Sequence, residues 1–159
     1  MSMLRHLYQH HRWANLRLID ALTAMPAEDL ARKTPGGFGT IQETLTHFVY
    51  NESRFLDVLS GGAVSLEAPP AAPTLSDLRA VADRNSARLV ELASTVDEDA
   101  RVTGNFRGRD FDFPAYIPLF QAYHHAVEHR TNITTILATY DLPVPNLDLW
   151  SFHEAGEPA

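Results

Sequence analysis

Two histidines, His125 and His129, are four residues apart. Of all the spacings in this sequence, theirs most directly indicates a site that could bind a metal ion. In an α-helix such residues lie one turn apart on the same face, so both imidazoles point to the same side at a separation that a metal ion can bridge. Ala122, Ile133 and Ile136 continue the same row, which therefore faces the core. Because a buried imidazole needs a hydrogen-bond partner or a metal ion to offset its desolvation, the pair is a candidate metal site.

His47 adds a third imidazole to this hypothesis. A histidine pair at helical spacing is common by itself and usually has one packed and one solvated member. His47, however, lies on the flank of an apolar stripe in an earlier helical segment, which an antiparallel arrangement would bring against the pair. Three neutral imidazoles suit zinc, nickel or iron and leave a coordination position open. The alternative is that all three histidines are packed core residues.

Composition narrows the class of protein. The length of 159 residues and the 45% hydrophobic content predict a single domain spanning residues 1–159. The net charge of −7 and the scattered basic residues argue against nucleic acid and anionic membranes as partners. Without cysteine the chain has no thiolate ligand or thiol nucleophile, so sulfur chemistry would need a cosubstrate's thiol. The absence of a signal-peptide pattern and of a membrane-spanning apolar run predicts a cytoplasmic protein.

Helical periodicity predicts an all-α fold, a four-helix bundle. Capping-box patterns at Thr40 and Thr74 mark two of the helix starts, and proline in a first turn, at Pro114 or Pro118, marks another. The predicted helices span residues 4–22, 40–59, 74–96 and from Pro114 or Pro118 to about Tyr140.

The segments between and after these helices also contain sequence patterns that predict local structure. The proline-rich stretch 60–73 predicts a long crossover between the second and third helices. Alternating apolar residues in 102–113 around a turn at Arg107 and Gly108 predict a small β-hairpin before the fourth helix. The apolar tail 146–152 should pack back on the bundle, and its aromatic residues favour a homodimer.

Three short motifs resemble motifs of a known protein superfamily. Residues 124–133, His-His-Ala-Val-Glu-His-Arg-Thr-Asn-Ile, resemble the Asn-His-x-x-x-His-Arg-Gly-Gln-Ile signature of the DinB/YfiT-like superfamily. Residues 13–15, Trp-Ala-Asn, resemble its first-helix motif, and residues 44–48, followed by Glu52, resemble its second-helix histidine segment. The resemblance implies a four-helix bundle with a long crossover. It also implies a divalent metal ion held by His47, His125 and His129, with zinc or nickel favoured over iron or manganese.

This chain departs from the usual signature at four positions, which affect the surroundings of the site more than its ligands. His124 stands where the family often has asparagine, and Glu128 where a second histidine is frequent. Thr131 and Asn132 replace the usual Gly-Gln.

Other polar residues have structural interpretations. His11 lies in an apolar stripe of the first helix and is interpreted as a core histidine with a hydrogen-bond partner, although it could also face a substrate. Glu52 is predicted to form a structural ion pair with Arg130, the alternative being a hydrogen bond to a ligand imidazole. Three further histidines are predicted to be solvated: His6, His10 and His153.

The resemblance leaves three functions open. The first is transfer or isomerisation with a low-molecular-weight thiol, because branches of the superfamily are bacillithiol and mycothiol transferases. The second is metal-dependent hydrolysis, for which Glu52, Glu128 and His124 are candidate general bases. The third is a non-catalytic bundle that binds a metal or ligand. In each case metal affinity is expected to weaken as the pH falls through about 6.5, the ordinary histidine range.

Overall fold

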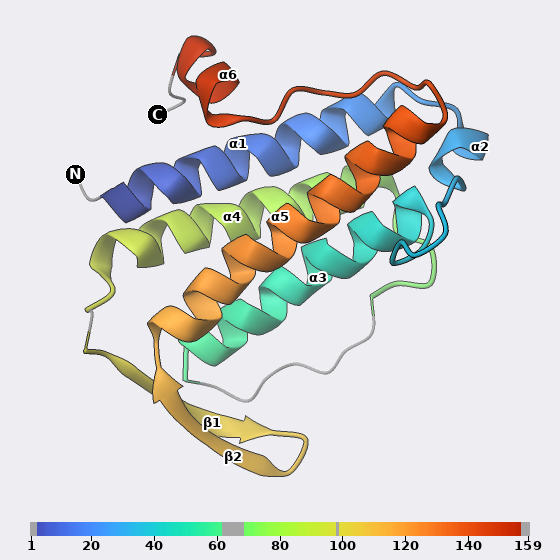
Figure 1. The fold of residues 1–159 in the computed structure, drawn as a ribbon. Helices are drawn as coiled ribbons and strands as arrows, with labels where there is room; N and C mark the ends of the chain where they lie inside the picture. Colours follow the sequence, from blue (N-terminus) through green and yellow to red (C-terminus); the bar gives the residue numbers. More distant parts are fainter. Residues whose placement is uncertain (1–2, 62–68, 98, 157–159) are drawn as a thin grey trace.

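Four long helices pack along one another in the computed structural model, which describes residues 3–61, 69–97 and 99–156 (Figure 1). They are α1 (Met3–Thr23), α3 (Ile41–Leu59), α4 (Leu75–Thr95) and α5 (Tyr116–Thr139). Helix α1 packs mainly on α4, α3 packs on both α4 and α5, and each of the four begins within a few residues of its predicted start. The described part of the chain is therefore mostly helical, as the periodicity predicts.

Local signals explain where three of these helices begin. The Thr40 hydroxyl accepts a hydrogen bond from the backbone of Glu43 at 3.1 Å, and the Glu43 carboxylate accepts one from the backbone of Thr40 at 2.9 Å. Thr74 and Asp77 form the same reciprocal box at the start of α4. Helix α5 has Pro118 in its first turn, where the missing N–H costs no helical hydrogen bond.

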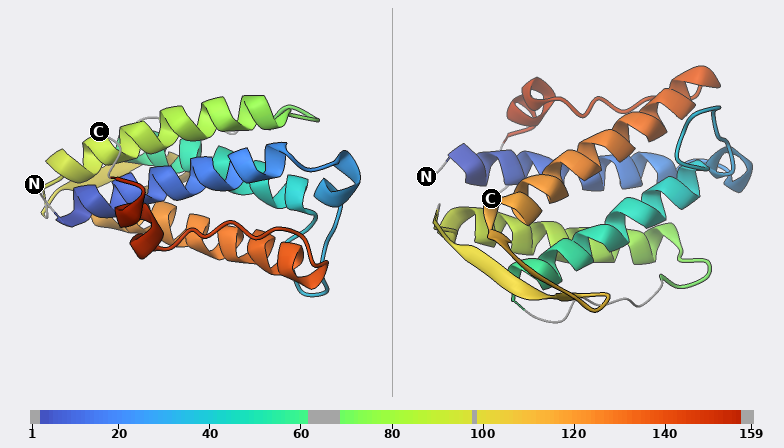
Figure 2. Two further views of the ribbon diagram at one scale, coloured as in Figure 1. Left: turned by 90° about the horizontal axis from the view of Figure 1, so that it is seen from above. Right: turned by 60° about the horizontal axis from the view of Figure 1, so that its bottom comes forward.

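Helices α3 and α4 run in the same direction (Figures 1 and 2). The chain leaves α3 at Leu59 and returns to the opposite end of that helix, where Gln42 donates a hydrogen bond to the carbonyl of Pro73 at 2.9 Å. This is the long connection that the sequence predicts, although its residues 62–68 lie outside the described ranges.

The predicted hairpin is present. Strand β1 (Arg101–Phe106) pairs antiparallel with β2 (Arg109–Pro114), and the turn between them has positive φ at Arg107 (53°) and Gly108 (78°). Two consecutive positive φ angles match the right-handed twist of the strands, and Asn105 further supports the turn by accepting a hydrogen bond from the Gly108 amide at 2.9 Å. The hairpin leads directly into α5 and so fixes where that helix begins.

The C-terminal tail packs back on α1, as predicted, and ends in the short helix α6 (Leu149–Glu154); the other short helix, α2 (Ala27–Leu30), follows α1. Phe152 is only 4% exposed and contacts His10 edge to face. The prediction that His10 is solvated is wrong, because the tail covers it and its Nε2 donates to the Leu147 carbonyl at 2.8 Å. His153 is exposed, as expected, and His6 is half-buried.

None of the helices in the described ranges combines the length and the hydropathy that a transmembrane span requires. Trp150 on α6 remains 79% exposed, and the homodimer stays a prediction that light scattering tests.

Candidate metal centre

His47 on α3 meets His125 and His129 on α5, as the sequence predicts. The Nε2 atom of His125 lies 3.1 Å from the Nε2 atoms of both other rings. The candidate ligand atoms of the three residues all lie within 4.8 Å of one another. Helix α5 supplies two imidazoles one turn apart, and its packing against α3 supplies the third.

The donor set fits a divalent metal ion. Nitrogen ligands about 2.0 Å from a tetrahedral ion are separated by about 3.3 Å, close to the separations that the rings already show. Hydrogen bonds cannot satisfy all three converging Nε2 atoms, because in a neutral imidazole each is either a donor or an acceptor and at least two of the three must have the same role. The buried Nδ1 atoms of His125 and His129 have no hydrogen-bond partner in the described part of the chain. A cation shared by the three Nε2 atoms would use lone pairs that otherwise face one another.

The surroundings keep these rings neutral. Burial lowers the pKa of His47 to about 4, with further contributions from His129 and Arg54. Burial, and then the neighbouring imidazoles, lower the pKa of His125 to about 4. The pKa of His129 is also lowered by burial. Since the neutral imidazole is the form that binds a metal ion, proton competition begins at a lower pH than the ordinary value of about 6.5 predicts.

These shifts predict how the stability of the metal-free protein depends on pH. The folded-state pKa values lie below the unfolded value of about 6.5, so the unfolded chain binds more protons between about pH 6.5 and 4. The melting temperature should therefore fall as the pH is lowered through this window. Thermal scans between about pH 7 and 5 avoid most carboxylate titration. The His125→Ala variant should lose less stability over this range than the parent, and an equal loss would contradict the prediction.

Aromatic rings surround the three histidines. Phe38, which follows the turn at Gly36 and Gly37, lies over His47 with ring centroids 4.0 Å apart and meets His129 edge to face at 5.1 Å. Phe55 on α3 meets His125 edge to face at 5.7 Å. The periodicity of α3 includes Phe55, but no sequence signal predicts Phe38, because its contact depends on the path of the loop before α3. These rings cover part of the imidazole surfaces, although Phe38 is itself 51% exposed.

Asn51 and Arg54 form a polar chain beside His47. The Asn51 amide nitrogen lies 3.1 Å from Nδ1 and 3.0 Å from Nε2 of His47, so it can donate to either ring nitrogen. Arg54 donates to the Asn51 side-chain oxygen at 2.9 Å and forms no ion pair with a carboxylate of the described residues. One side-chain amide therefore separates a positive charge from the candidate metal site. Helical spacing from His47 is the signal that could have identified Asn51.

A buried polar network lies behind the three histidines. Glu52, fully buried, accepts hydrogen bonds from Nε2 of His11 at 2.7 Å and from the Asn15 amide at 2.9 Å. Arg130, 5% exposed, donates to the Asn15 side-chain oxygen at 2.6 Å. The prediction for His11 is confirmed, whereas the predicted direct ion pair between Glu52 and Arg130 is wrong. Asn15 lies between them, because its amide can donate to the carboxylate and accept from the guanidinium at once.

Cavities flank the histidines on both sides. One of about 580 Å³ is lined by Phe38, His129 and Glu128, among others. Another of about 710 Å³ is lined by His47 and by residues 69–73. Glu128 thus lies at a mouth of the site, while His124 is exposed and contacts Glu128 at 3.6 Å.

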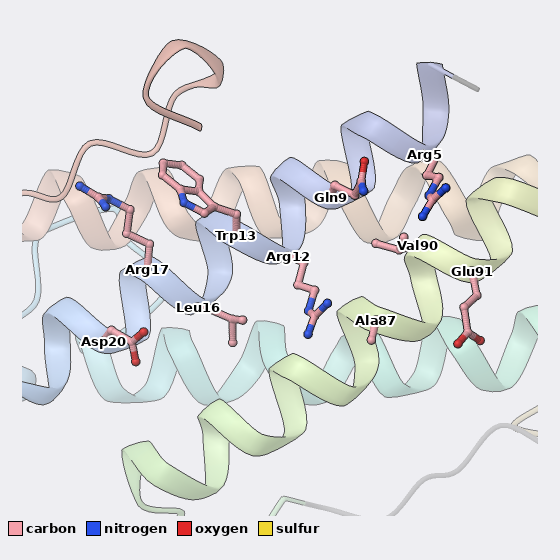
Figure 3. A pocket seen from close by; sticks show the side chains of 10 residues that line it. All are labelled: Arg5, Gln9, Arg12, Trp13, Leu16, Arg17, Asp20, Ala87, Val90 and Glu91. Atoms are coloured by element: carbon pink, nitrogen blue, oxygen red, sulfur yellow. The ribbon is translucent and has the colours of Figure 1, made fainter. Parts of the chain in front are cut away.

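A further cavity of about 640 Å³ lies between α1 and α4, and none of the three histidines lines it (Figure 3). Its three arginines already have interactions: Arg12 pairs with Asp83 at 2.8 Å, Arg17 donates to the Asn146 carbonyl at 3.0 Å, and Arg5 also interacts with another group. We therefore propose no catalytic or binding role for this cavity.

The fold and the site define a class: mostly helical proteins in which three histidines from two helices form a site able to hold a metal ion. The chain belongs to the DinB family, whose family model matches residues 1–158. The crystal structure of a DinB-like protein from Bacillus cereus is similar to this structure with a TM-score of 0.62 and 20% sequence identity, covering 87% of this chain and 90% of that chain. That likeness supports the fold. No curated protein matches this chain.

Proposed function

We propose that this protein is a divalent-metal-dependent enzyme of the DinB family with a four-helix-bundle architecture, and that it transfers a low-molecular-weight thiol to an electrophilic substrate or isomerises a substrate with that thiol. The observation that carries the proposal is the convergence of His47, His125 and His129 without a fourth candidate ligand from the described residues. Structural zinc sites normally close with four protein ligands, whereas catalytic sites keep a position open. Zinc or nickel suits three imidazoles best, and iron or manganese is the alternative.

The thiol chemistry follows from the donor set and from the lack of cysteine. A divalent ion at this site would lower the pKa of a bound thiol and so supply thiolate at neutral pH. The thiolate sulfur would then form a bond to an electrophilic carbon, and the leaving group would depart with its electron pair. The chain has no cysteine of its own to compete for the ion or for the electrophile.

The residues around the histidines have complementary roles in this proposal. Phe38 and Phe55 cover part of the imidazole surfaces, which would keep some water away from the reacting sulfur. Arg54, oriented by Asn51, is suited to hold an anionic group of the thiol or of its partner beside the site.

Metal-dependent hydrolysis is the second candidate, and the position of Glu128 favours it. Glu128 lines the same cavity as His129, so its carboxylate could accept a proton from a water molecule in that cavity. Of the other predicted general bases, Glu52 is already bound to His11 and Asn15.

A thiol-conjugation assay tests the proposal. The protein loaded with zinc or nickel is incubated with monochlorobimane and, in turn, glutathione, cysteine, bacillithiol and mycothiol. We expect faster conjugation with at least one thiol, and the uncatalysed rate for metal-loaded His125→Ala. If the metal-bound parent accelerates none of these reactions but hydrolyses activated esters, the second candidate replaces the first. If it does neither, the site is non-catalytic.

A further inference from the structure

A cavity beside the start of α3 reaches one of the three candidate ligands. Its volume is about 710 Å³, and small-molecule sites in proteins usually have roughly 300–1,000 Å³. Helix α3 lines it with two pairs of residues, Gln42 with Thr46 and Glu43 with His47. The members of each pair are four residues apart and so lie one turn apart on the same face of the helix. Because His47 is both part of this lining and a candidate ligand, a molecule in the cavity lies beside the candidate metal centre.

The rest of the lining is mostly hydrocarbon. It comes from Leu30 at the end of α2, from Leu75 at the start of α4, and from segment 69–73, whose sequence is Pro-Pro-Ala-Ala-Pro. Gln42 holds this segment against α3 through its hydrogen bond to the Pro73 carbonyl at 2.9 Å (Figure 1). Proline has a fixed φ and no N–H donor, so three of the five residues in the segment are rigid and offer no N–H to a ligand. A ligand that packs on this wall therefore needs to order little of the protein.

The polar side chains of the lining already have partners within the protein. The Thr46 hydroxyl donates to the Gln42 carbonyl at 2.8 Å, and the Gln42 amide is bonded to Pro73. Glu43 and Thr74 belong to the capping boxes that begin α3 and α4. A ligand therefore meets mainly hydrocarbon in this cavity. Among the described lining residues Glu43 is the one with a full charge, and that negative charge repels an anion.

We infer that this cavity binds the aromatic part of a neutral electrophilic substrate beside the candidate metal centre. The ring packs on the prolines of segment 69–73 and on Leu30 and Leu75. Proline-rich segments and aromatic side chains recognise each other in the same way in several peptide-binding domains. That the substrate is an electrophile rests on the proposed function. The preference for a neutral aromatic group rests on the lining alone, so the two can be tested separately.

Ligand-observed fluorine NMR on the zinc-loaded protein tests the cavity with 4-fluorobenzyl alcohol, an unreactive analogue of a benzylic electrophile. We expect saturable binding at millimolar concentrations. 4-Fluorobenzenesulfonate, which coordinates metal ions weakly, should bind at least about tenfold more weakly, because its charge would lie near Glu43 in an apolar space. Trifluoroethanol keeps the hydroxyl but lacks the ring, so it should not saturate in this range. His125 is not part of the lining, so His125→Ala should still bind 4-fluorobenzyl alcohol.

A matched pair of threonine variants locates the binding. The Thr46 and Thr139 hydroxyls each donate to the carbonyl four residues earlier at 2.8 Å, so replacing either one removes the same bond. A helical side chain leans toward the preceding turn, so the ring of Thr46→Phe would lie over Gln42, within the cavity, and should weaken 4-fluorobenzyl alcohol binding by at least about tenfold. Thr139 is exposed and is not part of this lining, so Thr139→Phe should bind as the parent does. Ala72→Phe fills the cavity from segment 69–73 and should behave like Thr46→Phe. Circular dichroism and the melting temperature establish that the variants fold.

Conjugation kinetics separate this inference from the proposed function. Monochlorobimane has a neutral ring system, so Thr46→Phe should raise its KM at least about tenfold, and Thr139→Phe should leave it unchanged. The inference is overturned, whether or not thiols are conjugated, if 4-fluorobenzyl alcohol does not bind, if the sulfonate binds as tightly, if folded Thr46→Phe and Ala72→Phe bind the alcohol as the parent does, or if His125→Ala abolishes binding. If binding follows the prediction but no thiol is conjugated, the cavity remains an aromatic-binding site, and it is the proposed thiol transfer that is wrong.

Discussion

Replacing His125 by alanine is expected to lower the affinity of the protein for zinc or nickel by more than about 100-fold. Loss of a hydrogen-bond partner outside the ligands typically costs about 10-fold to 100-fold in affinity, and loss of a ligand should cost more. His125 has the central position, because its Nε2 lies 3.1 Å from the Nε2 of both His47 and His129. Isothermal titration calorimetry on chelator-treated protein measures the change, and elemental analysis of the purified protein measures occupancy.

The control for this experiment is a histidine that lies away from the site. His153 is on α6 and exposed, so His153→Ala should bind metal as the parent does. His47→Ala and His129→Ala should behave like His125→Ala. Stoichiometric and equally tight metal binding by His125→Ala would show that the three histidines are packed residues and not ligands.

Replacing Glu52 by glutamine is expected to lower the free energy of unfolding by about 3–5 kcal/mol, because removing one charge of a buried, compensating set leaves the other unpaired. Glutamine has nearly the same volume, so the loss does not arise from a cavity. Glu52 is fully buried and Arg130 is 5% exposed, and Asn15 connects them. Urea denaturation followed by circular dichroism measures the change.

A surface ion pair provides the comparison for Glu52→Gln. Asp83 pairs with Arg12 at 2.8 Å, and both side chains are about 40% exposed. Exposed pairs of this kind contribute about 0–1 kcal/mol, so Asp83→Asn should change the free energy of unfolding little. If Glu52→Gln is as stable as Asp83→Asn, the buried network of Glu52, Asn15 and Arg130 does not stabilise the fold.

The sequence by itself determined the elements and part of the site. Capping boxes at Thr40 and Thr74 and the turn at Arg107 and Gly108 depend on residues within a few positions of one another, so they could be predicted without the fold. The same holds for the row that carries His125 and His129, because helical spacing alone places both on one face.

Contacts between distant segments required the tertiary structure. The apolar stripe beside His47 and then the family resemblance pointed to this residue, but the packing of α3 against α5 decided that it completes the triad. The path of the tail decided that His10 is buried, and the loop before α3 decided that Phe38 lies over His47.

The buried network of Glu52, Asn15 and Arg130 shows most clearly which features local sequence predicts and which depend on tertiary packing. The sequence pattern predicted a structural ion pair between Glu52 and Arg130. It predicted a direct pair, whereas the structure places the Asn15 amide between them. Periodicity fixes the direction in which a side chain points along its own helix, but the separation and rotation of neighbouring helices fix which groups come within hydrogen-bond distance. Those two quantities depend on the packing of the entire core, and no short segment of sequence encodes them.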